Sequence, residues 1–146
     1  MSAVAALVSP GSRLRRMRAP ALTLAGLALA GLALHLRDPH VGGSWGTCPS
    51  AALGIACPGC GTLRAVHDLT NLDLAAAASS NLAFVIALPL AAAVLVLWSV
   101  RRWRGRAMPD PATWPRRPAL ASAVLGAVLL VAFTVARNLP GSWLAP

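Results

Sequence analysis

Three long apolar runs without a charged residue constrain this chain more than any other feature of its sequence. The runs cover residues 19–36, 81–100 and 119–136. A helix rises about 1.5 Å per residue, so 18 residues span roughly 27 Å, which is just enough to cross a bilayer. The 146-residue chain is 57% hydrophobic and only 12% charged, about half the share that is usual in a soluble domain. We therefore expect a single all-α domain, an integral membrane protein with three transmembrane helices.

The arginines predict how these helices are oriented. The sequence has thirteen arginines and no lysine, and ten of the arginines lie in two clusters that flank apolar runs, at 13–18 and 101–117. Arginine is retained on the cytoplasmic side of a membrane. We expect a plasma (inner) membrane protein with a cytoplasmic N-terminus. Its expected segments between and beside the helices are a basic N-terminus at 1–18, an outer segment at 37–80, a basic cytoplasmic loop at 101–118 and an outer tail at 137–146.

The formal net charge of +9 could also indicate a nucleic-acid partner. However, the charges flank apolar runs, and the interleaved aromatic residues of a nucleic-acid stacking surface are absent from the sequence. We expect the lipid bilayer as the partner, together with other membrane proteins or a second copy of the chain, and no nucleic acid.

Two details qualify the apolar runs. The first run could belong to a cleaved signal peptide, because it follows a basic stretch and contains the small-x-small sequence Ala28-Leu29-Ala30. That sequence lies inside the run without a polar region before it, so we expect the first helix to remain. In the second run, Pro89 predicts a kink, which neighbouring helices or water can accommodate.

All three cysteines lie in the expected outer segment. They are Cys48, Cys57 and Cys60. Pro58 suits the first position of a helix, so we expect Cys57 near the N-cap and Cys60 in the first turn of a short interfacial helix, where exposed N–H groups favour a thiolate. After this helix, Asp73 predicts a new N-cap that leads into the second spanning helix.

Four interpretations of the cysteines remain open. An outer position permits a disulfide, most simply between Cys48 and either Cys57 or Cys60. Zinc binding would use three thiolates and a fourth ligand from His40 or His67, and His40 is geometrically easier because His67 lies about two helical turns beyond Cys60. A CxxC pair at the start of a helix also matches thiol-oxidoreductase chemistry. Finally, the thiols could simply stay reduced and buried.

The expected interfacial helix carries other polar side chains. Arg64 lies one turn from Cys60 and one turn from Asp68. It is expected either to pair with Asp68 or to bind an anion or a lipid headgroup beside the helix N-terminus. The sequence shows no nucleophile–base pair, carboxylate pair or phosphate-binding loop.

Several of these residues together resemble a known family. The sequence contains Cys48-Pro49, then Cys57-Pro58-Gly59-Cys60-Gly61 followed by Arg64-Ala65, then Asp73, and finally Arg137-Asn138-Leu139-Pro140. This pattern resembles the domain-of-unknown-function 2752 family of small bacterial membrane proteins, from about Arg37 onward.

The resemblance implies a few spanning helices around a CPxCG motif. It also implies supporting roles for Gly61, Asp68, Asp73 and Arg137, and it supplies no reaction. This chain departs from the family pattern at two places: the family generally has Thr immediately before the Arg, where Leu63 follows Thr62 here, and it commonly has Gly at the position of Leu72.

These observations predict a role for the chain but no chemical reaction. We expect a small multi-pass membrane protein with a structural or accessory role rather than an enzyme, and an outward-facing cysteine site that holds a disulfide or zinc. The alternative is a membrane thiol-disulfide oxidoreductase that uses the Cys57–Cys60 pair. A transporter is disfavoured because no ionisable residue lies deep within a spanning run.

Overall fold

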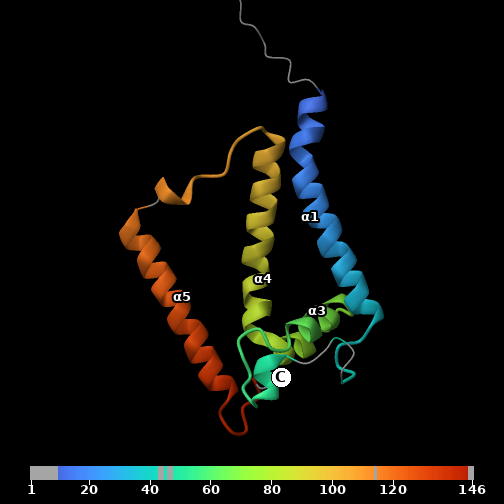
Figure 1. Cartoon of the computed structure of the whole chain (residues 1–146), viewed down its shortest axis with the longest axis vertical. Coiled ribbons are helices and arrows are strands. Elements are labelled where there is room, and N and C mark those ends of the chain that lie inside the picture. The colour runs from blue at the N-terminus through green and yellow to red at the C-terminus, as the bar shows by residue number, and fades with distance from the viewer. Residues whose placement is uncertain (1–9, 43–44, 46–47, 114, 145–146) are drawn as a thin grey trace, which may run out of the picture.

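The computed structural model describes residues 10–42, 45, 48–113 and 115–144 of the chain (Figure 1). The expected N-terminal segment 1–18 and tail 137–146 therefore lie partly outside the described residues. Within the described part, the structure is helical and contains no strand. The elements are α1 (Pro10–Leu36), α2 (Pro49–Ala52), α3 (Thr62–Thr70), α4 (Leu74–Trp103), the 3-10 turn η1 (Pro111–Thr113) and α5 (Arg116–Arg137).

Three of these helices are long and apolar enough to cross a membrane, which confirms the predicted fold class. The candidate spans are Arg13–Leu36, Leu74–Trp103 and Arg116–Arg137. Each helix extends beyond the uncharged run from which it was predicted, because arginine is a good helix former and continues the helix past the apolar stretch. In α4 the extension at the start comes from the alanine-rich stretch 74–80.

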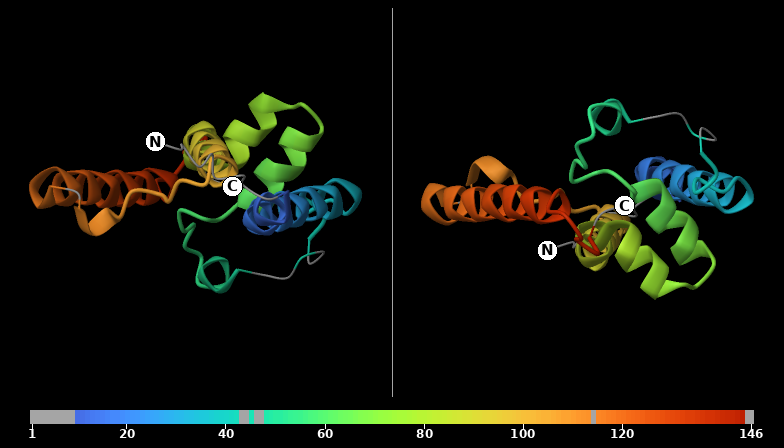
Figure 2. Two further views of the ribbon diagram at one scale, coloured as in Figure 1. Left: turned by 90° about the horizontal axis from the view of Figure 1, so that it is seen from above. Right: turned by 90° about the horizontal axis from the view of Figure 1, so that it is seen from below.

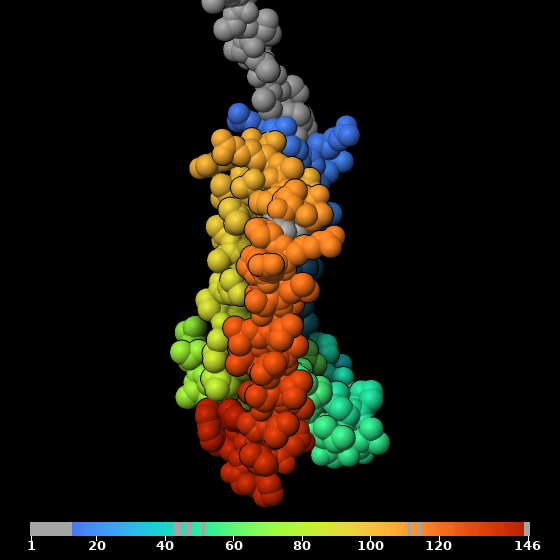
Figure 3. All heavy atoms as spheres, turned by 90° about the vertical axis from the view of Figure 1, so that its left-hand side faces the viewer, coloured from blue at the N-terminus to red at the C-terminus, as the bar shows by residue number. Residues whose placement is uncertain are grey.

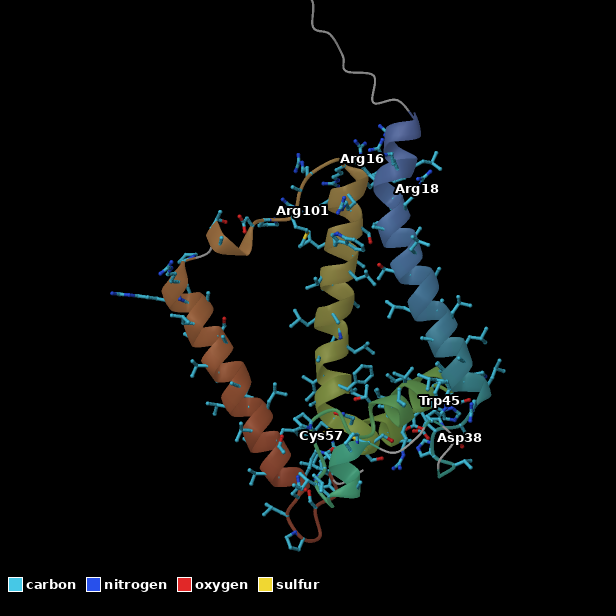
Figure 4. The ribbon with its side chains drawn as sticks, viewed as in Figure 1. Arg16, Arg18, Asp38, Trp45, Cys57 and Arg101 are labelled. Carbon is cyan, nitrogen blue, oxygen red and sulfur yellow. The ribbon has the colours of Figure 1, made fainter. Side chains whose placement is uncertain are left out.

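The long helices lie in one thin layer and alternate in direction (Figures 1 and 3). α4 meets α1 at one end of the layer, where the Arg13 guanidinium lies 5.9 Å from the centre of the Trp103 ring. At the opposite end α4 meets α5, and the views along the layer show α5 diverging from α4 elsewhere (Figure 2). We call these two ends the arginine end and the cysteine end, because Arg16, Arg18 and Arg101 lie at the first and Cys57 at the second (Figure 4).

A helical hairpin closes the cysteine end. α3 and the first two turns of α4 pack closely, and Ala65 and Ala77, one from each arm, are fully buried. Small side chains at these two positions let the backbones approach. Asp73 caps α4 as predicted, because its carboxylate accepts a hydrogen bond of 2.8 Å from the Ala76 N–H. Leu72, in the turn between the arms, has a left-handed φ of 62°.

α4 bends where its spanning part begins. The residue with non-helical geometry is Asn81, with φ −159° and ψ 91°. Pro89, where we expected a kink, shows no such departure. Asn81 is also the first residue of the apolar run 81–100, so the bend separates the hairpin arm from the membrane-spanning part of α4.

Candidate functional site

The three cysteines converge at the cysteine end. The Cys60 sulfur lies 3.1 Å from that of Cys57 and 3.9 Å from that of Cys48, and all three sulfurs lie within 4.8 Å of one another. The exposure of the three thiols decreases from Cys48 through Cys57 to the buried Cys60. Residues from two separate stretches of the segment 37–80 thus meet at one point.

Cys57 and Cys60 lie before α3, so the prediction that Cys60 lies in the first turn of that helix is wrong. α3 begins only at Thr62, and its N-cap, Gly61, has a left-handed φ of 78°. Cys57 to Cys60 form a turn before this cap, closed by a hydrogen bond of 3.1 Å from the Cys60 N–H to the Cys57 carbonyl. A glycine adopts this φ without steric strain, so Gly61 starts the helix after the cysteines and leaves their side chains free to converge.

Ser50 is a member of the cysteine site that the sequence did not reveal. Its hydroxyl oxygen lies 3.0 Å from the Cys48 sulfur and 3.5 Å from the Cys60 sulfur. Hydrogen bonding from Ser50, and then from Cys60, lowers the pKa of the Cys57 thiol to about 6. Burial raises the pKa of Cys60. The two thiols of the CxxC turn therefore differ in acidity, with Cys57 the more readily ionised.

A buried arginine holds the backbone of the cysteine turn. Arg137, only 1% exposed, donates from Nη1 to the Cys57 carbonyl at 3.3 Å and from Nη2 to the Cys60 carbonyl at 2.9 Å. Its guanidinium also lies 5.1 Å from the centre of the Phe133 ring. The last residue of α5 thereby fixes two carbonyls of a turn that lies about 80 residues earlier in the chain.

Asn81 holds the same turn from α4. Its side-chain amide donates to the Pro58 carbonyl at 2.9 Å, to the Cys60 carbonyl at 3.1 Å and to the Thr62 hydroxyl at 3.1 Å. Its amide oxygen accepts a hydrogen bond of 3.0 Å from the Phe84 N–H and so caps the spanning part of α4. One buried side chain therefore both bends α4 and fixes the cysteine turn.

Asn138 completes this set. Its side chain accepts from the Ala56 N–H at 2.9 Å and donates to the Ala56 carbonyl at 3.0 Å, next to Cys57. We call Asn81, Arg137 and Asn138 the carbonyl clamp. Only Arg137 was a predicted site residue, because an amide at the edge of an apolar run carries no local signal of a partner so far away in the sequence.

The histidines form a second cluster instead of completing a zinc site with the cysteines. His40 Nδ1 lies 2.8 Å and His67 Nε2 lies 3.7 Å from the same carboxylate oxygen, Oδ1 of Asp38. Hydrogen bonds from the backbone N–H of His40, and then from its side chain, lower the pKa of Asp38. Among the described residues, the cysteine and histidine groups whose ligand atoms converge are separate. The prediction that His40 or His67 completes the cysteine group is therefore not supported by the geometry.

The predicted pair between Arg64 and Asp68 is also wrong. Asp68 is buried, accepts a hydrogen bond of 2.8 Å from the Ser80 hydroxyl and lies 3.4 Å from Nε2 of His40. The Arg64 side chain makes no hydrogen bond or ion pair with another residue of the described part of the chain. Asp68 therefore belongs to the histidine cluster, and an anion or lipid site at Arg64 stays a prediction.

A family model described as a protein of unknown function, DUF2752, matches residues 48–95. Over these residues the chain is similar to that family. The DUF2752 segment begins at Cys48 and contains the whole CPxCG motif, α3 and most of α4, so the predicted family is confirmed over these residues. Arg137 and Asn138 of the clamp lie outside it. No curated protein and no solved structure matches the chain.

Proposed function

We propose that this chain is a structural or accessory protein of the plasma membrane whose three cysteines bind a metal ion, Zn²⁺ in the first instance, on the outer side. The observation that carries the proposal is the convergence of all three sulfurs within 4.8 Å. A disulfide would use only two of the sulfurs and would not explain why the third lies beside them. A metal ion uses all three.

The donor set suits zinc. Tetrahedral Zn²⁺ with Zn–S bonds of about 2.3 Å separates its sulfur ligands by roughly 3.8 Å. The sulfurs of Cys60 and Cys48 are 3.9 Å apart, which matches that value, and those of Cys57 and Cys60, at 3.1 Å, are closer than that value. The lowered pKa of Cys57 favours the thiolate that a metal requires. Three thiolates leave a fourth position for water or for a ligand from a partner.

The charge distribution supports the location. Arg16, Arg18 and Arg101, from the two arginine clusters, lie at one end of the layer, and Cys57 lies at the other (Figure 4). With the arginine end in the cytoplasm, the N-terminus is cytoplasmic and the cysteine site faces outward. The bilayer surrounds the spans, and α5, which diverges from α4, leaves an apolar surface for another membrane protein or a second copy of the chain (Figure 2).

Metal content tests this proposal. The full chain, purified in mild detergent without chelator, should carry one tightly held Zn²⁺ at the cysteines. Cys48→Ser, Cys57→Ser and Cys60→Ser should each release it, whereas Ser79→Ala, at an exposed hydroxyl, should retain it. Thiol alkylation without reductant should label three cysteines only after chelation. If one cysteine is labelled without reductant and three are labelled with it, whether or not chelator is present, two of the cysteines form a disulfide and the metal proposal is wrong.

A second candidate rests on a separate observation. Cys57 and Cys60 are 3.1 Å apart and have opposite pKa shifts, as in an attacking thiolate and its resolving partner. The Cys57 thiolate would attack a disulfide of a partner protein and release one partner thiolate. Cys60 would then lose its proton and attack the Cys57 sulfur, which yields a Cys57–Cys60 disulfide and a reduced partner. Reduction of one equivalent of a disulfide substrate by the reduced chain, lost in both Cys57→Ser and Cys60→Ser, would select this function.

A further inference from the structure

All three histidines of the sequence gather in one cluster at the cysteine end, apart from the three cysteines. The His67 ring stacks on that of His35 at 6.5 Å between centroids and meets that of His40 edge-on at 5.7 Å. The elements involved are the end of α1, the loop after it and α3. We propose that Asp38, His40 and His67 form a second metal site, for a divalent transition-metal ion. The proposal does not rest on the cysteine site.

The ligand atoms converge on one point. Oδ1 of Asp38 lies 2.8 Å from Nδ1 of His40 and 3.7 Å from Nε2 of His67, and one ligand atom from each of the three residues lies within 4.8 Å of the others. Two imidazole nitrogens and a carboxylate oxygen thus face the same small volume, which leaves open positions for water or for another ligand.

The hydrogen bonds of His67 fix which nitrogen faces this point. Nδ1 lies 2.8 Å from the Leu34 carbonyl oxygen, which can only accept, so Nδ1 carries the proton. Nε2 of a neutral ring then presents its lone pair toward Asp38. A histidine that binds a metal nearly always donates its other N–H to such a carbonyl or to a carboxylate.

His40 is oriented in the same manner. Its Nε2 lies 3.4 Å from Oδ1 of Asp68, whose side chain is 7% exposed, and Nδ1 faces Asp38. The other oxygen of Asp68 accepts a hydrogen bond of 2.8 Å from the buried Ser80 hydroxyl. Contacts from Ser80 on α4 to Asp68 on α3, and from Asp68 to His40, therefore orient the His40 ring. Metal-binding histidines are usually oriented by such partners outside the ligand set.

The donors define the class of ion. Imidazole and carboxylate together suit Zn²⁺, Co²⁺, Ni²⁺ and Cu²⁺ better than Mg²⁺ or Ca²⁺, and they are harder than the three thiolates of the cysteine site. The His40 and Asp38 side chains are 41% and 44% exposed, so an ion can reach them from water. A bound ion would connect the loop after α1 to α3.

The same contacts without a metal would be an ion pair in which a protonated His40 bridges Asp38 and Asp68. Binding of Cu²⁺ separates the two possibilities. We would titrate Cu²⁺ into the full chain in mild detergent, with Cys48, Cys57 and Cys60 all replaced by Ser, and record its electron paramagnetic resonance. We expect one ion per chain with nitrogen couplings from two imidazoles. The absence of these couplings would overturn the proposal.

Single variants in the same background identify the ligands. His40→Gln and His67→Gln should each weaken Cu²⁺ binding at least tenfold, and Asp68→Asn should weaken it by about tenfold through the orientation of His40. The matched control is His35→Gln: His35 stacks on His67 and lies 3.1 Å from the Thr70 hydroxyl, but it does not belong to the converging group of Asp38, His40 and His67. Equal loss in His35→Gln, or unchanged binding in His40→Gln and His67→Gln, would overturn the site.

The wild-type cysteines provide a second measurement in case the serine background folds poorly. In the otherwise unchanged chain, His67→Gln should lower the zinc content at saturating Zn²⁺ by one equivalent relative to wild type and to His35→Gln. Equal zinc content in the three proteins would overturn the histidine site. Loss of cysteine-bound zinc in the cysteine variants is a separate readout, so failure of one site is distinguishable from failure of the other.

Discussion

The cysteine end and the membrane-spanning parts of the helices are organised by opposite kinds of side chain. The most apolar stretches of α4 and α5 contain no buried residue, and that of α1 is only 11% buried. At the cysteine end, by contrast, polar and charged groups are buried. They are Asp68, Ser80, Asn81 and Arg137. In lipid, apolar side chains gain little by meeting one another, so the spans can remain apart, while buried polar groups must find partners and thereby fix the fold.

Arginine illustrates the same contrast. At the arginine end, the Arg13 and Arg102 guanidinium groups each lie 5.9 Å from the centre of a tryptophan ring, an arrangement typical of a membrane interface. Arg137 is instead 1% exposed and donates to three backbone carbonyls. The same residue type anchors a helix in the interface at one end and organises a site at the other.

Arg137→Met should have the largest effect. Its loss leaves the carbonyls of Cys57 and Cys60 without their charged donor, at a cost of about 3 kcal/mol or more in unfolding free energy. Arg116→Met, at the exposed opposite end of the same helix, should change it by no more than about 0.5 kcal/mol. Reversible unfolding in mixed micelles measures both. Equal losses of unfolding free energy in Arg137→Met and Arg116→Met would contradict the organising role of Arg137 at the cysteine end.

Asn81→Ala should cause the second-largest loss of unfolding free energy. It removes donors to the Pro58 and Cys60 carbonyls and the cap of Phe84, and we expect a loss of about 2 kcal/mol. The loosened turn should also make Cys60 react faster with an alkylating agent. The exposed Asn71 supplies the control, since Asn71→Ala should leave Cys60 protected. An unchanged rate for Cys60 in Asn81→Ala would contradict a clamp that positions the turn.

The pH dependence of thiol labelling gives a third test, in reduced, metal-free protein. Because the Cys57 pKa is about 6, its alkylation rate should rise as the pH passes through about 6, whereas Cys60, with its raised pKa, should remain protonated there. Ser50→Ala removes a hydrogen bond to the Cys57 thiolate, so the profile should move to higher pH. The lowered pKa also stabilises the fold fully above the pKa of the unfolded thiol, about 8.5, and this contribution is lost as the pH falls to 6.

Leu72→Gly should have the smallest effect, and it should be stabilising. Leu72 is 93% exposed and has a φ of 62°, which is unfavourable for a residue with a Cβ. Glycine relieves this strain without loss of packing, so we expect a gain of roughly 0.5 kcal/mol. Leu74→Gly, at an exposed leucine that is the first residue of α4, relieves no such strain and should give no gain. A destabilised Leu72→Gly would contradict the turn geometry.

The spanning helices could be predicted from the sequence, whereas most contacts at the cysteine end could not. Apolar runs predicted the spanning helices, because a stretch that is too apolar for water needs only its own composition to become a helix in lipid. Asp73 predicted an N-cap, because its partner Ala76 lies three residues away. The predicted position of Cys60 in a first helical turn is wrong, because Pro58 favours a helix start there, whereas the helix begins after the left-handed Gly61.

The sequence by itself therefore determined the fold class, the spans, the cap at Asp73 and the segment that carries the cysteines, since each of these depends on neighbours within a few turns. Only the tertiary structure decided which side chains meet. Arg137 reaches Cys60 across 77 positions, and His67 reaches Leu34 across 33. These partners depend on how the helix ends pack against one another at the cysteine end, because buried polar groups there need hydrogen-bond partners. A local sequence pattern does not contain that information.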